Sequence, residues 1–126
     1  MINATSRPTP YQSELNSPSH TLLSDAPVGK GGGGAGFGAH QLLEASLASC
    51  MNMAVRMHAD AQGYALRHVS TQVSLDWPDD TTTRFSYAIV LEGDLTQGQR
   101  DELHAVADSC PVRRTLANRL VFEEGV

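Results

Sequence analysis

The side chains of this sequence most able to do chemistry are its two cysteines, Cys50 and Cys110, which lie sixty residues apart. The thiolate is the reactive form of cysteine, and the surroundings decide how much of a thiol is ionised. Cys110 directly precedes Pro111, a residue that suits the first turn of a helix. Unpaired N–H groups and the helix dipole would favour a negative charge there, and the nearby Arg113 and Arg114 would add to that effect.

Cys50 lies in the stretch EASLASCMNMAVRMHADAQG, among Leu and Met side chains. Loss of hydration there disfavours a thiolate, so a reactive Cys50 needs a cation or a hydrogen-bond donor from another segment. Three alternatives stay open beside redox chemistry: two inert core thiols, a structural disulfide, and a zinc site. The sequence has five histidines but neither C-x-x-C nor H-x-x-x-H spacing, so we expect no metal.

The length, net charge and hydropathy of the chain limit its number of domains, its partners and its location. The chain is long enough for one compact domain, taken here as residues 1–126 with a polar, flexible segment at 1–10. A net charge of -5 without a basic run argues against nucleic acid as a partner. No run approaches the roughly 20 apolar residues of a membrane span, and no secretory signal is seen. We therefore expect a cytoplasmic protein, and in that reducing compartment a disulfide is more often transient and functional.

Residues 39–62 predict one long helix, because good helix formers dominate the segment and Gly63 suits the position after its end. Its first four turns are apolar on almost every side, which is typical of a central, buried helix. A single copy would leave a large apolar face in water, so the helix itself predicts a homodimer. The residues that share the face of Cys50 are Leu43, Leu47, Ala54 and Met57.

The remaining patterns predict strands and two further helices, an α+β layout. Thr96 and Gln99 form a candidate capping box for the first of these helices. The expected elements are strands in 11–15 and 20–25, a hairpin of 66–77 and 84–93, helices in 95–110 and 111–119, and a last strand in 120–124. The side chains that alternate onto one face of the hairpin are Val69, Thr71, Val73, Leu75, Phe85, Tyr87, Ile89 and Leu91.

The segment GAHQLLEASLASCMNMAVRMHADAQGY, with ADSCPVRRTL downstream, resembles the OsmC/Ohr superfamily, which includes osmotically induced protein C and the organic hydroperoxide resistance proteins. The usual pattern is an acidic, Pro-led helix start, then LLxAALAxC, then xCPVxxTL. The resemblance covers about residues 11–123. It implies an OsmC-like α+β fold, in which antiparallel strands surround a long central buried helix, and an intertwined homodimer with two sites at the interface.

The resemblance also implies a reaction, the reduction of organic hydroperoxides by a thiol-dependent peroxidase. Cys50 would be the peroxidatic cysteine and would become a sulfenic acid. Cys110 would resolve it as a disulfide. An external dithiol, a lipoyl group in the Ohr branch, would restore the thiols, with no bound cofactor or metal. Apolar Leu and Met side chains, Met53 among them, favour an organic peroxide over hydrogen peroxide.

The sequence departs from the family pattern where the thiolate is activated. Ohr-like members carry a Glu ten residues before the first cysteine, where this chain has His40, and an Arg in the N-terminal hairpin region. Between Tyr11 and Cys50 this chain has no Arg. The candidate substitutes are Lys30, Arg56, Arg113 and a charged His40.

His40 lies too far along the helix to contact Cys50 of its own chain. It precedes Cys50 by roughly 15 Å along the same helix, so it could reach only the partner's Cys50, across an antiparallel two-fold interface. The missing Glu–Arg pair also keeps an alternative function open. In that alternative the chain is an OsmC-like small-molecule binding or thiol-redox sensing protein without sustained peroxidase turnover.

Overall fold

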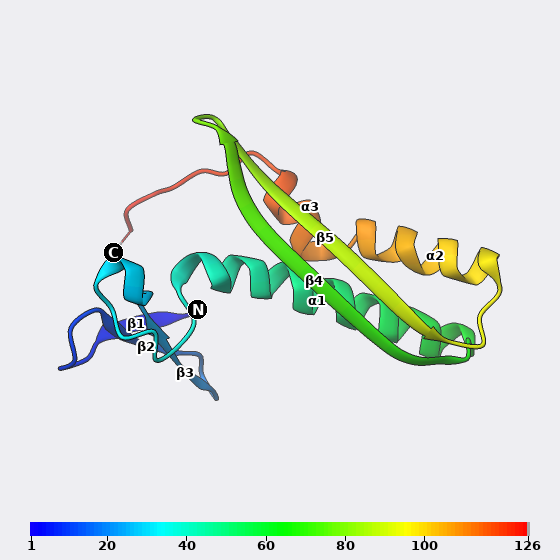
Figure 1. Ribbon diagram of the computed structural model, residues 1–126, viewed down its shortest axis with the longest axis horizontal. Coiled ribbons are helices and arrows are strands. Elements are labelled where there is room, and N and C mark those ends of the chain that lie inside the picture. Colours follow the sequence, from blue (N-terminus) through cyan, green and yellow to red (C-terminus); the bar gives the residue numbers. More distant parts are fainter. Residues whose placement is uncertain (126) are drawn as a thin grey trace. The chain divides into compact units, whose positions relative to one another are not determined.

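The computed structural model describes residues 1–125 and has the predicted α+β composition, with antiparallel sheets and one long helix (Figure 1). Its contacts divide the chain into two units, Met1–Leu43 and a second unit that begins at Glu44. No helix within residues 1–125 is long and apolar enough to cross a membrane. The elements are β1 (Asn3–Ser6), β2 (Gln12–Asn16), β3 (Thr21–Asp25), the 3-10 helix η1 (Val28–Lys30), α1 (Ala39–Gln62), β4 (Leu66–Asp79), β5 (Thr82–Gly93), α2 (Gln97–Asp108) and α3 (Pro111–Ala117).

The first unit contains an antiparallel sheet in the order β1-β2-β3. Strands β2 and β3 form where the sequence predicts them, on either side of a turn in which Ser17 N–H donates to the His20 carbonyl at 2.9 Å. Strand β1 corrects the sequence prediction, which has no strand within residues 1–10. All four of its residues are exposed, so backbone pairing with β2, and not burial, accounts for this strand.

Helix α1 begins and ends at the predicted residues. Gly63 follows it with φ of 70°, in the left-handed region that glycine adopts without strain. Gly63 N–H donates to the Asp60 carbonyl at 3.2 Å, and Tyr64 N–H donates to the Ala59 carbonyl at 2.9 Å. This pair of hydrogen bonds is the Schellman motif, which satisfies the last carbonyls of a helix.

One face of α1 is buried in the second unit, and another face is exposed in the single chain. The buried residues recur every fourth position: Leu47, Met51, Val55 and Ala59. They pack in one cluster with side chains of the hairpin and of α2, including Leu91, Leu103 and Ala107. On another face, Met53 is 52% and Met57 67% exposed. This is the exposed apolar surface that the sequence predicts for a single copy.

Strands β4 and β5 form the predicted hairpin, and their register brings the predicted apolar positions opposite one another. Val69 pairs with Leu91, and Thr71 pairs with Ile89. Because opposed side chains lie on the same face of an antiparallel pair, this register builds one continuous apolar surface. That surface packs on the buried face of α1.

Four residues of α1, spaced by four positions, form hydrogen bonds to β4 and fix the helix against the hairpin. Three of them use their side chains and one uses its backbone carbonyl. Spacing by four places them in one row along the helix, so the row can follow an extended strand. The contacts are Leu75 N–H to Glu44 Oε1 at 2.8 Å, Thr71 Oγ1 to the Ala48 carbonyl at 2.8 Å, Asn52 Nδ2 to the Val69 carbonyl at 3.0 Å, and Arg56 Nη2 to the Leu66 carbonyl at 2.5 Å.

Replacement of Asn52 tests this row. Asn52→Ala is expected to lower the free energy of unfolding by about 1–2 kcal/mol, because it leaves the part-buried Val69 carbonyl without its donor. Urea denaturation measures this change. The matched control is Asn118→Ala, at an exposed position after α3, which is expected to stay within about 0.5 kcal/mol of the wild type. Equal stability of the two variants would show that the Asn52 contact does not hold α1 to β4.

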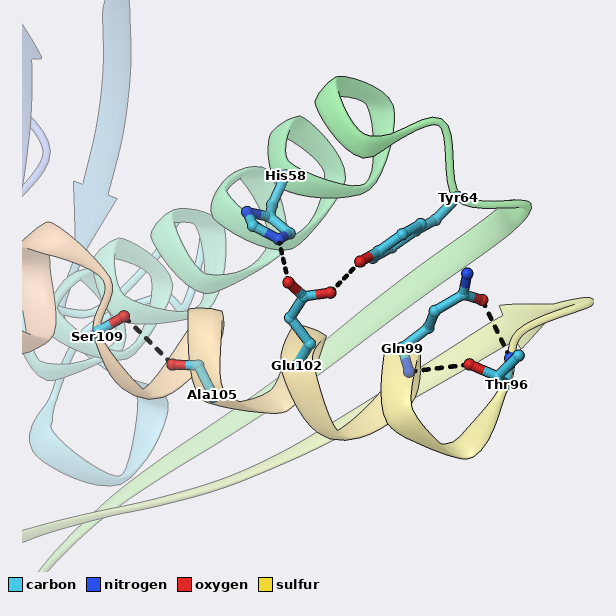
Figure 2. A network of polar contacts seen from close by, with 7 residues as sticks. All are labelled: His58, Tyr64, Thr96, Gln99, Glu102, Ala105 and Ser109. Atoms are coloured by element: carbon cyan, nitrogen blue, oxygen red, sulfur yellow. Dashed lines mark hydrogen bonds and ion pairs between the residues drawn. The ribbon is translucent and has the colours of Figure 1, made fainter.

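The C-terminal third confirms two predictions and corrects one. The capping box at α2 is present: Gln99 N–H donates to Thr96 Oγ1 at 3.1 Å, and Thr96 N–H donates to Gln99 Oε1 at 3.0 Å (Figure 2). Helix α3 begins at Pro111 as predicted. The strand predicted at 120–124 is wrong, since these residues form no strand and Phe122 is exposed. A strand needs a partner backbone, and within residues 1–125 this segment pairs with none.

Candidate functional site

The thiols of Cys50 and Cys110 are neighbours within the second unit. Cys50 lies in the middle of α1, and Cys110 is the residue between α2 and α3 that caps the start of α3. The Cys50 side chain lies close enough to Cys110 to raise the pKa of its thiol, and both are free thiols. Residues of α1, α2 and the α2–α3 junction share one buried cluster, which explains how thiols so distant in sequence meet.

Cys110 is sheltered, with only 1% of its surface exposed. Burial raises the pKa of the Cys110 thiol, and the neighbouring Cys50 raises it further. The backbone N–H groups of Arg113 and Val112 act in the opposite direction, as a helix N-terminus should, but they do not outweigh burial. The sequence prediction that the helix start would favour a Cys110 thiolate is therefore corrected: desolvation raises the pKa of this thiol.

Cys50 is the more accessible of the two. It is partly exposed, packs against the edge of the buried cluster, and lies between the buried Met51 face and the exposed Met53 face of α1. A reactant arriving from solvent therefore meets Cys50 before Cys110. This difference suits a pair in which one thiol reacts first and the sheltered thiol reacts second.

Two of the proposed substitute cations have other partners in the structure. The guanidinium of Arg56 donates to the Leu66 carbonyl at 2.5 Å, and its Nε lies 3.5 Å from Asp60. The guanidinium of Arg113 lies near the hydroxyl of Tyr87 and lowers its pKa, while the backbone N–H of Arg113 faces Cys110. The other two, Lys30 and His40, lie in the first unit.

Lys30 and His40 line the same pocket of the first unit, which has a volume of about 510 Å³. Tyr11 and the buried Asp25 also line it. Asp25 accepts from Ala35 N–H at 3.0 Å and thereby holds the glycine-rich segment that leads to α1. The pocket brings together the two cationic candidates that the sequence points to, separated by ten residues of chain.

A second polar cluster of the second unit connects α1 to α2 (Figure 2). Glu102 of α2 accepts a hydrogen bond from the Tyr64 hydroxyl, and its other carboxylate oxygen lies 3.3 Å from His58 Nε2. The hydrogen bond from Tyr64, and then the contact with His58, hold the pKa of Glu102 below its usual value. The same hydrogen bond raises the pKa of Tyr64. The sequence signals no such cluster, because the three residues belong to separate segments.

This cluster makes stability depend on pH in the acid range. A carboxylate whose pKa is lowered in the folded state adds stability above its unfolded pKa of about 4.3, and this stability is lost as the pH falls through the folded value. We expect the difference in unfolding free energy between wild type and Glu102→Gln to be largest near neutral pH and to shrink below about pH 4. Urea denaturation at several pH values measures it. When Tyr64 is also replaced by Phe, the effect of Glu102→Gln on the unfolding free energy should be smaller. If Glu102→Gln lost stability with falling pH as the wild type does, this assignment would be contradicted.

Within residues 1–125, no three His, Cys, Asp or Glu side chains are grouped so as to hold a metal ion.

Comparisons with known proteins agree on the type of fold. The family model described as OsmC-like protein matches residues 31–124. An organic hydroperoxide resistance protein OsmC from Legionella pneumophila is 25% identical, with a TM-score of 0.66 over 93% of this chain and 88% of that one. An OsmC-like protein from Mycoplasma pneumoniae is 18% identical, with a TM-score of 0.77 over 92% and 85%. The organic hydroperoxide resistance protein OhrB of Bacillus subtilis is 22% identical, with a TM-score of 0.60 over 93% and 90%. None of the curated proteins is a significant match.

Proposed function

This chain belongs to the OsmC-like protein family, and on that basis we propose that it is a thiol-dependent peroxidase that reduces organic hydroperoxides. The observation that carries the proposal is the contact between the accessible Cys50 and the sheltered Cys110. Two relatives of the same fold are named organic hydroperoxide resistance proteins, which supports the choice of reaction.

The proposed reaction has three steps. The Cys50 thiolate attacks the distal oxygen of the hydroperoxide, the O–O bond breaks, and the alcohol leaves with a proton, which makes a sulfenic acid on Cys50. The Cys110 sulfur then attacks the Cys50 sulfur, which forms the disulfide and releases water. A dithiol of the lipoyl type reduces the disulfide and is itself oxidised. The raised pKa of Cys110 fits the second role, because a protonated resolving thiol does not compete for peroxide.

The first step needs a Cys50 thiolate, and the chain lacks the Glu–Arg pair of Ohr-like members. We assign the replacement to the charged groups of the first unit, with His40 foremost and Lys30 beside it, acting on the partner's Cys50 across a two-fold interface. Arg113 acts on the other thiol, through its backbone N–H toward Cys110.

The active form in this proposal is a homodimer. Met53 and Met57 on α1 are large apolar side chains more than half exposed in the single chain, and such a surface on a central helix is typical of an interface. Pairing of the two α1 helices would bury it. Because Met53 is one turn from Cys50, the same interface would form an apolar wall for the organic part of the substrate and would favour an organic hydroperoxide over hydrogen peroxide.

A second candidate function follows from the missing Glu–Arg pair. In it, the chain is an OsmC-like binding or redox-sensing protein whose Cys50 oxidises once and whose disulfide is not cycled by a dithiol. The pocket of the first unit, with Lys30, His40 and Asp25, favours this alternative as a place for a small ligand.

Turnover separates the two functions. Wild-type protein supplied with cumene hydroperoxide and excess dihydrolipoamide is expected to consume many equivalents of peroxide, measured as loss of peroxide over time. Cys110→Ser is expected to turn over more slowly, because its sulfenic acid must be resolved by the external dithiol instead of by Cys110. Consumption of a single equivalent by the wild type, with any dithiol, would favour the sensor and contradict the peroxidase.

A further inference from the structure

Cys110 lies in a short junction between two helices. Helix α2 ends at Asp108, Ser109 N–H donates to the Val106 carbonyl at 3.2 Å, and α3 begins at Pro111. Cys110 N–H donates to the Ala107 carbonyl at 3.2 Å, so its backbone continues the last turn of α2. The position of the Cys110 thiol therefore depends on how this junction is held against the rest of the second unit.

One side chain of the hairpin contacts the junction on both sides of Cys110. The Tyr87 hydroxyl, from β5, donates a hydrogen bond to Asp108 Oδ1, and the Arg113 side chain lies near enough to lower the pKa of Tyr87. Asp108 lies two residues before Cys110 and Arg113 three residues after it. The Tyr87 hydroxyl thus bonds the Asp108 side of the junction to the hairpin and lies near the Arg113 side chain on its other side.

The charges around Tyr87 agree with this geometry. The hydrogen bond to Asp108 is the largest cause that raises the pKa of Tyr87, and the Arg113 guanidinium partly offsets it. Tyr87 is opposite Val73 in the hairpin register, on the face that also carries the buried Val69 and Leu91. Tyr87 therefore lies on the same face of the hairpin as the residues that pack against α1, the helix that carries Cys50.

We propose that Tyr87 is a positioning residue for the disulfide step, in which its hydroxyl holds the Asp108–Arg113 junction so that the Cys110 sulfur stays against Cys50. This inference rests on the proposed function. In the step concerned, the bond between the Cys110 and Cys50 sulfurs forms, the S–O bond of the sulfenic acid breaks, and water leaves. Tyr87 supplies no atom to this reaction. Its effect is on the effective concentration of one thiol near the other.

The inference separates the two steps of the cycle. Attack on the peroxide uses Cys50 alone, whereas formation of the disulfide needs Cys110 in place. Tyr87→Phe keeps the ring and removes the hydrogen bond to Asp108 of the junction. We expect it to slow formation of the disulfide by about tenfold and to leave the rate of sulfenic acid formation within about twofold.

Tyr64→Phe is the matched control, because the Tyr64 hydroxyl also donates to a carboxylate of α2, that of Glu102, but does not contact the junction. Each variant loses a phenol–carboxylate hydrogen bond, so a general loss of stability would affect both. Rapid-quench experiments with a single equivalent of cumene hydroperoxide measure the two steps: a dimedone-type reagent traps the sulfenic acid, and mass spectrometry quantifies the disulfide. Slower disulfide formation in Tyr87→Phe alone supports the proposal. Equal disulfide rates in all three proteins, or slowing only of sulfenic acid formation, would overturn it.

A second measurement needs no peroxide and so distinguishes failure of this inference from failure of the proposed function. Equilibration with glutathione disulfide converts the two thiols to the protein disulfide and yields two molecules of glutathione, and the equilibrium constant is the effective concentration of the thiol pair. Tyr87→Phe is expected to lower it about tenfold, and Tyr64→Phe to leave it unchanged. An unchanged value in Tyr87→Phe overturns the positioning role even if the wild type is a peroxidase.

A further variant covers the case in which Tyr87→Phe does not fold. Asp108→Asn keeps an acceptor oxygen for the Tyr87 hydroxyl, whereas Asp108→Ala removes it. The effective concentration is expected to fall by about tenfold in Asp108→Ala and to be largely retained in Asp108→Asn. Equal values in these two variants would contradict the inference.

Discussion

Cys50→Ser is expected to abolish peroxide turnover, with a loss of at least about 10³-fold in kcat/KM for cumene hydroperoxide, because an alcohol is far less ionised than a thiol at neutral pH and the nucleophile of the first step is gone. Cys50 is the accessible member of the pair, whereas Cys110 is almost completely buried and burial raises the pKa of its thiol. Cys110 therefore cannot take over the attack. The rate of peroxide loss with excess dihydrolipoamide measures the effect.

A shifted thiol provides the control for this variant. In the double variant Cys50→Ser with Ser49→Cys, a thiol remains on α1 but points about 100° away around the helix axis, at an exposed position. It should not restore turnover, because it lies away from Cys110. Retained turnover in Cys50→Ser itself would reject the peroxidase mechanism, and restored turnover in the double variant would show that contact with Cys110 is not needed.

Met53→Glu is expected to dissociate the proposed homodimer, with a dissociation constant raised by at least about 100-fold. Met53 is half exposed on the apolar face of α1. In an isologous interface the substitution appears once in each protomer, so two carboxylates would be buried without partners, at several kcal/mol. Sedimentation velocity over a range of protein concentrations measures the change.

Ala105→Glu is the matched control for this second variant, since it adds the same charge to an exposed position of α2. It is expected to sediment as the wild type does. A wild-type protein that is monomeric at micromolar concentration, or a Met53→Glu variant that stays dimeric, would contradict pairing through α1. Peroxide turnover should fall together with dimerisation in Met53→Glu, because the proposed sites include groups from both subunits.

Much of the fold could be predicted because its signals are local. Both ends of α1 follow from helix-forming residues and from Gly63, and the hairpin follows from alternation of apolar and polar side chains. The strand at Asn3–Ser6 and the absence of one at 120–124 could not be predicted in this way, because a strand depends on a partner elsewhere in the chain. Leu120, Val121 and Phe122 have strand-forming side chains but no partner backbone within the described residues.

The two cysteines of the candidate site could be predicted from the sequence, but the pKa of the Cys110 thiol could not. The resemblance to a two-cysteine family pointed to Cys50 and Cys110, and the structure brings their thiols together. The balance at Cys110 depends on burial, which opposes the N-terminus of α3 and outweighs it, and sequence alone does not measure burial. The sequence pattern places Tyr87 among the apolar residues of the hairpin and gives no sign of a further role. Its proximity to Asp108 and Arg113 arises only when the hairpin packs on the helices.

The central claim is that peroxide oxidises Cys50 and that Cys110 then closes a disulfide with it. Its most direct test is peptide mass spectrometry of the wild-type protein after treatment with one equivalent of cumene hydroperoxide and alkylation of the remaining thiols. We expect a Cys50–Cys110 cross-linked peptide pair in most chains, which disappears on addition of dihydrolipoamide. Alkylation of both cysteines in protein that has consumed the peroxide, or a stable sulfenic or sulfinic acid on Cys50 beside an alkylated Cys110, would contradict the account.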